Sequence, residues 1–349
     1  TQHWPAEYGG RDASPWRHAI VGEEMWAIGE PRGAQYMNVN WIGPAIMTYG
    51  TETQKAEHLP RISAGDVLWC QGFSEPEAGS DLAALSTEAL AVGDEYVING
   101  SKIWTSYCNH ADFIILLVRT DPGSSRHRGI SVLLVPMQTP GIEIREIPSV
   151  VGERYFHEVF FTDVRIPDTH RLGDVNQGWG VALTTLMNER ASIGSGSGGT
   201  GGSYTKLSAM LKHFELNEDA LSRQQLMNIF TYGKVLGWSN QRTMDALKAG
   251  KTPGPEMSLS KMGLTRQMQA TCNFVSDVLE ARLIADTGEW GTFSWAGYLL
   301  GQPAMRIAGG SDEVMRNIVG ERVLGLPKEP GIDTTSPFRE IRVGTQKSD

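Results

Sequence analysis

The sequence predicts an α+β protein in which a helical segment is followed by a β segment and then by a second helical segment. Residues 13–49 carry few helix breakers, short β-branched runs follow from Val67 onward, and long helical patterns return after Gly178. A chain of 349 residues is too long for one ordinary core. We therefore expect an N-terminal helical domain over residues 1–69, a central β domain over 70–172 and a C-terminal helical domain over 173–349.

The composition is that of a globular protein and argues against two classes of partner. Hydrophobic residues make up 40% and charged residues 20% of the chain, which is outside the range of chains that stay unfolded. The formal net charge is −9, so we expect no nucleic-acid partner, because binding to phosphate backbones needs excess positive charge. No run approaches the roughly 20 apolar residues of a membrane-spanning helix, so we expect no membrane span.

Cysteine and histidine usage predicts neither disulfides nor a metal site. The cysteines are few, odd in number and far apart, namely Cys70, Cys108 and Cys272. The eight histidines form no His-Glu-x-x-His string and no other recognised ligand spacing. We expect a chain that works in a reducing cytoplasm and holds no metal.

The N-terminal segment reads as helices joined by short turns. Because the chain opens on Thr1 and on a loop-like stretch around Trp4-Pro5, we expect residues to precede it. Residues 13–49 predict two helices with a bend at Gly29–Gly33. Thr51-x-x-Gln54 has the spacing of a capping box, which predicts a helix over residues 52–59 that ends at Pro60.

The central segment reads as a series of short strands. Asn99-Gly100 lies between Tyr96–Ile98 and Lys102–Trp104, and an Asn-Gly pair between apolar runs predicts a β-hairpin. Further strands are predicted over residues 113–118, 130–135, 142–147 and 158–161. Strands at this spacing predict a small barrel or sandwich.

The C-terminal segment predicts helices over residues 179–190, 221–247, 258–285 and 314–324. A glycine-rich run over Gly194–Gly202 interrupts them, and each glycine inside a helix costs about 1 kcal/mol relative to alanine. We read this run as a loop. A phosphate cradle is the weaker reading, because no Gly-Lys-Ser/Thr string closes the run and no strand precedes it.

Three strings give the chain a family resemblance. They are Gly72–Asp81 (GFSEPEAGSD), Lys102–Ser106 (KIWTS) and Gly309–Glu313 (GGSDE), the last followed by Arg316-Asn317 and the string ERVLG. Together they resemble the acyl-CoA dehydrogenase family over almost the whole chain, with the opening helices of full-length members absent. The resemblance implies an FAD-dependent enzyme that oxidises an acyl-CoA thioester to the trans-2-enoyl thioester and passes electrons to an electron-transfer flavoprotein.

The resemblance also implies roles for individual residues. Ser106 matches the donor to flavin N5, Trp104 matches the residue along one side of the ring, and Gly79-Ser80 match a turn near flavin phosphate or CoA. Taken alone, Trp104 also fits an aromatic residue in a hairpin core. The residues expected on the cofactor are Phe73, Ser74, Gly79, Ser80, Trp104, Thr105, Ser106, Ser311 and Glu313; those expected on the substrate are Ser80, Arg190, Gly309 and Gly310.

The catalytic base is where the chain departs from the common pattern. Many members keep a glutamate in a Tyr-Glu-Gly-Thr string, but Gly309 holds that position here and has no carboxylate. A minority pattern, that of isovaleryl-CoA dehydrogenase, carries the glutamate on an earlier helix just before an arginine, and Glu189-Arg190 match it. We expect Glu189 to be the base and the N–H of Gly309 to polarise the thioester carbonyl. The alternative for Glu189 is an exposed or ion-paired helix glutamate.

Two further departures concern assembly and substrate. The Arg-x-x-Phe-Gly string that reaches a neighbouring subunit's flavin is missing between Gly202 and Trp238, and a Gly-Gly-x-Gly-Tyr run is replaced by Asp286–Trp290. These losses favour a heterotetramer with a related subunit, as in some actinobacterial steroid-degrading members, while a homotetramer stays open. Small residues over 191–196 favour a bulky or branched acyl group, or else only loosen a turn. A non-catalytic partner subunit and an acyl-CoA oxidase are the competing functions.

Overall fold

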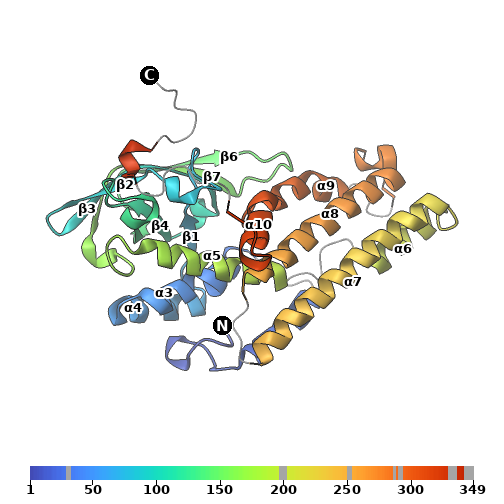
Figure 1. Ribbon diagram of the computed structural model, residues 1–349, viewed down its shortest axis with the longest axis horizontal. Coiled ribbons are helices and arrows are strands. Elements are labelled where there is room, and N and C mark those ends of the chain that lie inside the picture. The colour runs from blue at the N-terminus through green and yellow to red at the C-terminus, as the bar shows by residue number, and fades with distance from the viewer. Residues whose placement is uncertain are drawn as a thin grey trace, which may run out of the picture. The chain divides into compact units, whose positions relative to one another are not determined.

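The computed structural model describes residues 1–28, 33–195, 203–249, 254–285, 288–289, 294–328 and 336–341 (Figure 1). The chain divides into two compact units, each treated by itself below. Unit 1 takes residues 1–18, 31–189 and 329–349, and unit 2 takes 19–30 and 190–328. The expected bend near Gly29, most of the glycine-rich run after Gly194 and three residues of Asp286–Trp290 fall outside the described residues.

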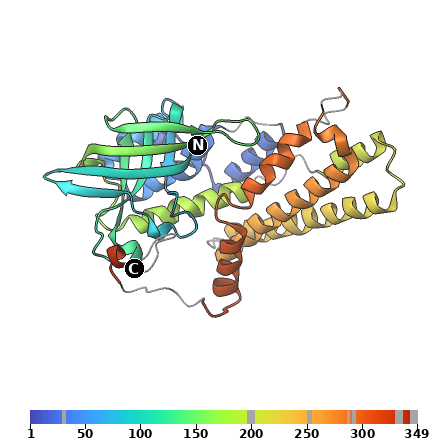
Figure 2. The same cartoon turned by 90° about the horizontal axis from the view of Figure 1, so that it is seen from above.

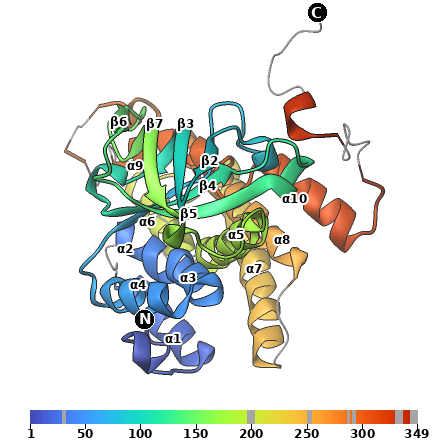
Figure 3. The same cartoon turned by 90° about the vertical axis from the view of Figure 1, so that its left-hand side faces the viewer.

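The N-terminal helices of unit 1 pack on one face of a sheet, as Figure 3 shows for α3 and α4. The elements are a 3-10 turn at Ala6–Tyr8, α1 (Pro15–Ala27, shared with unit 2), α2 (Ala34–Met37), a π-helical turn at Asn38–Ile42, α3 (Gly43–Tyr49) and α4 (Glu52–Ala64). The capping box is confirmed: Gln54 N–H donates to Thr51 Oγ1 at 3.2 Å, and Thr51 N–H donates to Gln54 Oε1 at 3.0 Å.

The expected end of α4 at Pro60 is wrong. The helix continues to Ala64 and stops at Gly65, which has φ of 83° and donates to Arg61 and Ile62 carbonyls. Proline removes one backbone hydrogen bond. Burial of Ile62 at 1% exposure, beyond the proline, offsets that loss.

The central sheet has seven strands, and the structure describes every residue from the first strand to the last. They are β1 (Trp69–Gly72), β2 (Glu88–Val92), β3 (Glu95–Ser106), β4 (Phe113–Arg119), β5 (Ile130–Pro136), β6 (Ile142–Ile147) and β7 (Phe156–Pro167). Their order is β1-β4-β2-β3-β7-β6, with β5 paired to β4, and β1 runs parallel to β4. The two 12-residue strands β3 and β7 pair with each other, so the β2–β3 and β6–β7 pairs lie next to each other in the sheet (Figure 2).

The hairpin expected at Asn99-Gly100 is also wrong, because β3 runs straight through these residues. The tight turn lies instead at Gly93-Asp94, between β2 and β3. Gly100 has φ of 146°, marks a register shift against β7, and leaves no room for a side chain, since a Cβ would lie 2.7 Å from Thr87 Cα. The Asn-Gly signal thus marks a bulge and a close approach rather than a turn.

Strands β4 and β5 are buried on both faces of the sheet. Along β4, Ile115 and Leu117 join the core shared with the helices, whereas Ile114 and Leu116 join a second core enclosed by the curled sheet. Successive side chains of a strand point to opposite faces, so a strand covered on both sides is apolar throughout. This explains the unbroken run Phe113–Val118 that predicted the strand.

Unit 2 is a helical bundle in which α7 and α8 run side by side (Figures 1 and 2). Its helices are α6 (Tyr204–His213), α7 (Ala220–Lys248), α8 (Ser258–Leu279), α9 (Ser294–Met305) and α10 (Asp312–Ile318); α5 (Gly178–Ser195) begins in unit 1 and ends in unit 2. The helix expected over 258–285 ends at Leu279, followed by a 3-10 turn at Glu280–Leu283. The helix expected over 314–324 begins at Asp312 and becomes π-helical over Val319–Val323.

A buried ion pair in unit 1 ties the segment after β1 to β3. Lys102 is 0% exposed, and its Nζ donates to Glu75 Oε1 at 2.7 Å and to the Phe73 carbonyl at 3.2 Å. The Glu75 carboxylate also accepts from Ser86 and Thr87 N–H groups. Burial by itself raises the pKa of Glu75, but Lys102 and these donors outweigh it and hold the pKa below its usual value.

We predict that Lys102→Met lowers the free energy of unfolding by about 3–5 kcal/mol, because it leaves a buried carboxylate without its cation. Adding Glu75→Gln should recover part of that loss. Since the pKa of Glu75 is depressed on folding, the pair's contribution is present above the unfolded pKa and is lost as the pH falls through the folded value. Urea unfolding at neutral and acid pH measures both effects.

The matched control is the exposed pair Arg145–Glu143 on β6, whose side chains are 60% and 61% exposed. Arg145→Met should lower the free energy of unfolding far less than Lys102→Met does, because solvent screens an exposed pair. If the Lys102→Met protein were as stable as the Arg145→Met control, the buried pair would not be what holds the segment after β1 to β3.

Candidate active site

Trp104 stands at an irregularity of β3. The pairing of β3 with β7 shifts register between Lys102 and Thr105, and Trp104 has φ of 59°. Its side chain is 55% exposed. The Trp104 and Phe156 rings meet edge-on, with their centroids 5.8 Å apart. A bulky residue in the left-handed region is strained, and such strain concentrates at functional sites. The exposed indole excludes the hairpin-core interpretation and offers a flat apolar surface.

The segment Phe73–Glu75 runs along this irregularity. Ile103 N–H donates to the Ser74 carbonyl at 2.9 Å, and Lys102 holds the Phe73 carbonyl. The Phe73 side chain is buried in the core, so only its backbone is available to a ligand. The structure therefore brings Ser74 beside the irregularity that carries Trp104.

The hydroxyl groups of Ser74 and Ser106 are half-buried and have no hydrogen-bond partner among the described residues. Two such groups near an exposed indole are a donor set for the polar edge of a planar ring. Thr105 differs, because it is fully buried opposite His157 on β7. Both residues are 0% exposed, so the Thr105 side chain lies inside the protein, and within the described chain neither its hydroxyl nor the ring nitrogens of His157 find a partner.

The turn Gly79–Asp81 is open to solvent. A Cβ added at Gly79 would have no other atom within 4 Å, Ser80 is exposed, and Asp81 lies 3.6 Å from Arg126. The preceding residues form a tight pair, since Glu75 and Ala78 exchange both backbone hydrogen bonds. The turn is thus fixed at its base and accessible at its tip, as the expected contact with flavin phosphate or CoA requires.

Glu189 lies on the inward face of α5. Ala182, Thr185 and Leu186 pack toward the core, and Glu189 follows Thr185 by four residues and Leu186 by three. The opposite face carries the exposed Leu183 and Met187. Glu189 is accordingly half-buried rather than exposed. The side chain of Arg190 lies outside the described part of the helix.

In unit 2, Gly309 and Gly310 form a turn before α10. Their φ values are 66° and 93°, which glycine adopts without strain. Ser311 caps α10 by accepting from Val314 N–H at 3.2 Å, which occupies one acceptor site of its hydroxyl and leaves the O–H able to donate. Glu313 is exposed and pairs with Arg316. The turn therefore offers backbone groups and no carboxylate at residue 309.

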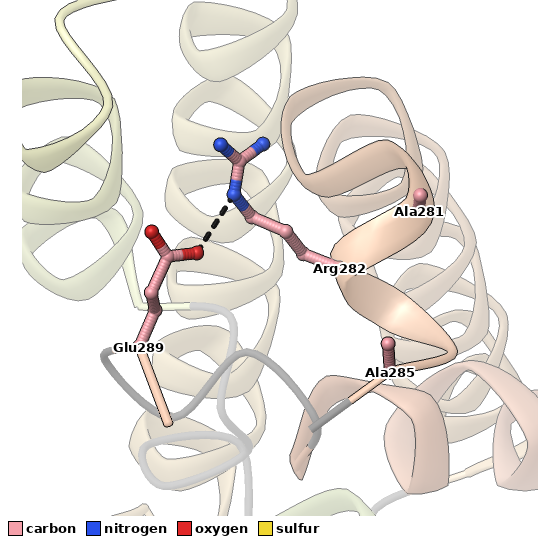
Figure 4. A pocket seen from close by; sticks show the side chains of 4 residues that line it. All are labelled: Ala281, Arg282, Ala285 and Glu289. Atoms are coloured by element: carbon pink, nitrogen blue, oxygen red, sulfur yellow. Dashed lines mark hydrogen bonds and ion pairs between the residues drawn. The ribbon is translucent and has the colours of Figure 1, made fainter. Parts of the chain in front are cut away.

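A pocket of about 410 Å³ in unit 2 was not foreseen from the sequence (Figure 4). It is lined by Ala281, Arg282, Ala285 and Glu289, and Arg282 Nε donates to Glu289 Oε2 at 2.9 Å. The ion pair satisfies much of the guanidinium charge. A phosphate group would have to compete with the Glu289 carboxylate for Arg282, so the pocket suits a phosphate poorly.

Other features of the described residues bear on the chemistry. They include no group of three His, Cys, Asp or Glu side chains placed to hold a metal ion. Cys70, Cys108 and Cys272 are buried free thiols. Among the helices that the structure describes, none is long and apolar enough to cross a membrane.

Comparison with known proteins places the chain in a family. Family models described as the N-terminal, middle and C-terminal domains of acyl-CoA dehydrogenase match residues 1–66, 70–164 and 176–324. The acyl-CoA dehydrogenase IpdE1 of Mycolicibacterium smegmatis is 36% identical, with 93% of this chain and 84% of IpdE1 covered. FadE34 of Mycobacterium tuberculosis is 34% identical over 93% of this chain, which spans only 44% of FadE34's length.

Solved structures agree with this assignment. The Tcur3481-Tcur3483 steroid ACAD superposes with a TM-score of 0.86 at 30% identity, covering 94% of this chain and 85% of its own. The ChsE4-ChsE5 complex of Mycobacterium tuberculosis gives 0.79 at 30% identity, covering 94% and 86%. The order of helical, curled-sheet and helical segments is confirmed as that fold. With family matches along most of its length, the chain belongs to the acyl-CoA dehydrogenases, a family of oxidoreductases.

Proposed function

We propose that the chain is the flavin-bearing subunit of an acyl-CoA dehydrogenase in which Glu189 is the base. The observation that carries the proposal is the presence of a half-buried glutamate on the inward face of α5 in a chain that has glycine at residue 309. A glutamate carboxylate on this face can serve as the proton acceptor that α-proton removal requires. The product is the trans-2-enoyl thioester.

FAD fits the unit 1 site. Trp104 provides an exposed flat surface, Ser106 and Ser74 provide hydroxyl groups that have no partner in the described chain, and Gly79-Ser80 provide an accessible turn. Bound FAD supplies the acceptor for the hydride that leaves the substrate β carbon. Ser106 would hold the polar edge of the ring and Trp104 would cover one side of it. Thr105, being buried, contributes through its backbone alone.

The remaining steps rest on side chains and backbone of the chain itself. Glu189 accepts the α proton, while the N–H of Gly309 donates to the thioester oxygen and stabilises the negative charge that develops there. Gly310 keeps the turn in its left-handed conformation. Ser80 lies in an exposed turn suited to the CoA part of the substrate.

A steroid or other bulky acyl-CoA is the substrate class that we propose. The structural relative described as a steroid ACAD supports this choice, and so do the small residues that follow the base in sequence. Electrons would leave to an electron-transfer flavoprotein. The free, buried thiols fit a reducing cytoplasm.

We further propose that the chain assembles with a related subunit into a heterotetramer. The Arg282–Glu289 pair occupies the stretch that replaces the family's glycine-rich run, and its carboxylate disfavours a partner's flavin pyrophosphate. The two heteromeric structural relatives support the same arrangement. A homotetramer would have to hold its flavins with these contacts missing.

Glu189→Gln should lower turnover by about 10² to 10⁴, because the amide keeps the shape of the side chain but cannot accept a proton. The assay uses the flavin-loaded protein, steryl-CoA and an artificial electron acceptor. Glu143→Gln, which alters an exposed pair on β6, is the control and should leave turnover unchanged. Near-wild-type turnover in Glu189→Gln would refute the base assignment.

Ser106→Ala should shift the absorption spectrum of bound flavin and lower the amount retained through gel filtration, because a hydrogen bond to the ring is lost. Ser106→Thr keeps the hydroxyl and should restore both properties. If the flavin spectrum of Ser106→Ala were identical to the wild-type spectrum, Ser106 would lie away from the ring.

The assembly proposal predicts that flavin occupies half of the chains in the purified complex. The protein made alone should be colourless or only weakly yellow, and production together with its related subunit should give a heteromer with one flavin for every two chains. Flavin absorbance per polypeptide, combined with native mass spectrometry, measures this ratio. A fully loaded homotetramer would overturn the heteromer.

A further inference from the structure

A buried polar cluster underlies the glycine turn of unit 2, and no role for it follows from the sequence strings. Asp312 is 7% exposed, Lys261 on α8 is 4% exposed and Thr265 is 2% exposed. Asp312 Oδ1 accepts from Lys261 Nζ at 3.2 Å and from Thr265 Oγ1 at 3.0 Å, while Oδ2 accepts from Arg306 Nε at 3.0 Å. One carboxylate thus joins α8, α10 and the end of α9.

The same cluster closes the turn through the backbone. The Arg306 carbonyl accepts from Asp312 N–H at 2.9 Å and from Lys261 Nζ at 3.2 Å. The two ends of the segment Arg306–Asp312 are therefore clamped together by the main chain and again by the Arg306–Asp312 ion pair. Between the clamped ends, Ile307 and Ala308 N–H groups are used in bonds to Ala304.

Gly309 and Gly310 are left with free donors at the middle of this clamp. In the part of the chain that the structure describes, neither N–H donates a hydrogen bond. Glycine at positive φ has a wide range of conformations available to it, so two in succession would lose a defined direction unless their flanks were fixed. The clamp supplies that constraint.

We propose that Asp312 is a positioning residue that holds the Arg306–Ser311 turn so that the Gly309 N–H points at the thioester oxygen of the substrate. The inference rests on the proposed function for its ligand, but the clamp itself is a property of unit 2. A donor must be aligned with the position that the oxyanion will occupy, and a displacement of about 1 Å costs on the order of 10²-fold in rate.

The charges in the cluster explain why the carboxylate is suited to this task. Burial by itself raises the pKa of Asp312, but hydrogen bonds from Arg306, Lys261 and Thr265 outweigh burial and hold the pKa below its usual value. Asp312 therefore stays ionised at neutral pH and accepts from all three donors. Asparagine would present an N–H₂ group toward one of these donors and would break the clamp.

The first test is hydrogen exchange in the flavin-loaded complex without substrate. Asp312→Asn should speed exchange of the Ile307, Ala308 and Asp312 amides by about 10-fold or more, because these bonds then open locally. Asp277→Asn on α8, whose carboxylate accepts from Gln225 in an exposed bond, is the matched control and should leave these amides unchanged. Unchanged exchange in Asp312→Asn would overturn the proposal.

The second test separates positioning from stability. With the acyl-CoA that the wild-type complex oxidises, Asp312→Asn should lower kcat roughly 10- to 100-fold and change KM less than about 3-fold, since contacts to CoA remain. Combining it with Lys261→Gln removes the unpaired buried ammonium and should restore thermal stability while kcat and amide protection stay low. Recovery of all three would assign the cluster a merely structural role.

A second variant and a separate readout distinguish failure of the clamp from failure to fold and from failure of the proposed function. Thr265→Val removes a single donor to Asp312 and should give the same changes at smaller size if Asp312→Asn fails to fold. A wild-type complex that oxidises no acyl-CoA would refute the proposed function, whereas the exchange of the Arg306–Asp312 segment would still decide whether the clamp exists.

Discussion

The buried Lys102–Glu75 pair is the interaction on which the unit 1 site depends. It connects β3 to the segment that leaves β1, and the same ammonium holds the Phe73 carbonyl. Removing both charges from water is costly, and the pair persists only because backbone donors from Ser86 and Thr87 complete the shell of the carboxylate. Everything expected to touch the flavin in unit 1 is within a few residues of one end of this pair. Because the hydrogen bonds of this pair are directional, they hold the two segments in one relative position.

Each unit holds a short segment with positive φ in a fixed conformation, and the two units do so with different residues. In unit 1, the exposed Trp104 has a left-handed backbone conformation at a register shift between Lys102 and Thr105, and Lys102 is itself held by Glu75. In unit 2, the turn uses glycines, which adopt positive φ without strain, and the definition comes from the Asp312 cluster beneath. In both cases a buried, fully hydrogen-bonded carboxylate fixes the flanks of a short segment whose middle faces outward.

Sequence patterns predicted the order of the segments and most helices and strands, because apolar periodicity reports burial directly. These patterns gave wrong predictions where the same residue type occurs in more than one kind of local structure. Asn99-Gly100 reads as a hairpin from local chemistry, but the close approach of Thr87 makes it a bulge, and Thr87 is distant in sequence. Pro60 reads as a helix end, yet tertiary burial of Ile62 carries the helix past it. The family resemblance named Trp104 and Glu189 as candidates, while the Asp312 cluster joins residues about fifty positions apart and leaves no local signal.

In the proposed mechanism, a base on α5 also changes what the glycine turn has to do. A turn that carries a catalytic carboxylate must position a side chain and a backbone donor together, and the charge of one disturbs the other. With glycine at residue 309 the turn has only the donor to present, and its precision depends on the flanks alone. Of the two acids that follow in this stretch, Glu313 is exposed and pairs with Arg316, whereas Asp312 is buried and neutralised by Lys261 and Arg306, so its charge is directed into the protein. The proposed separation of base and oxyanion donor thus gives each candidate its own support: the inward row of α5 for Glu189 and the buried cluster for Gly309.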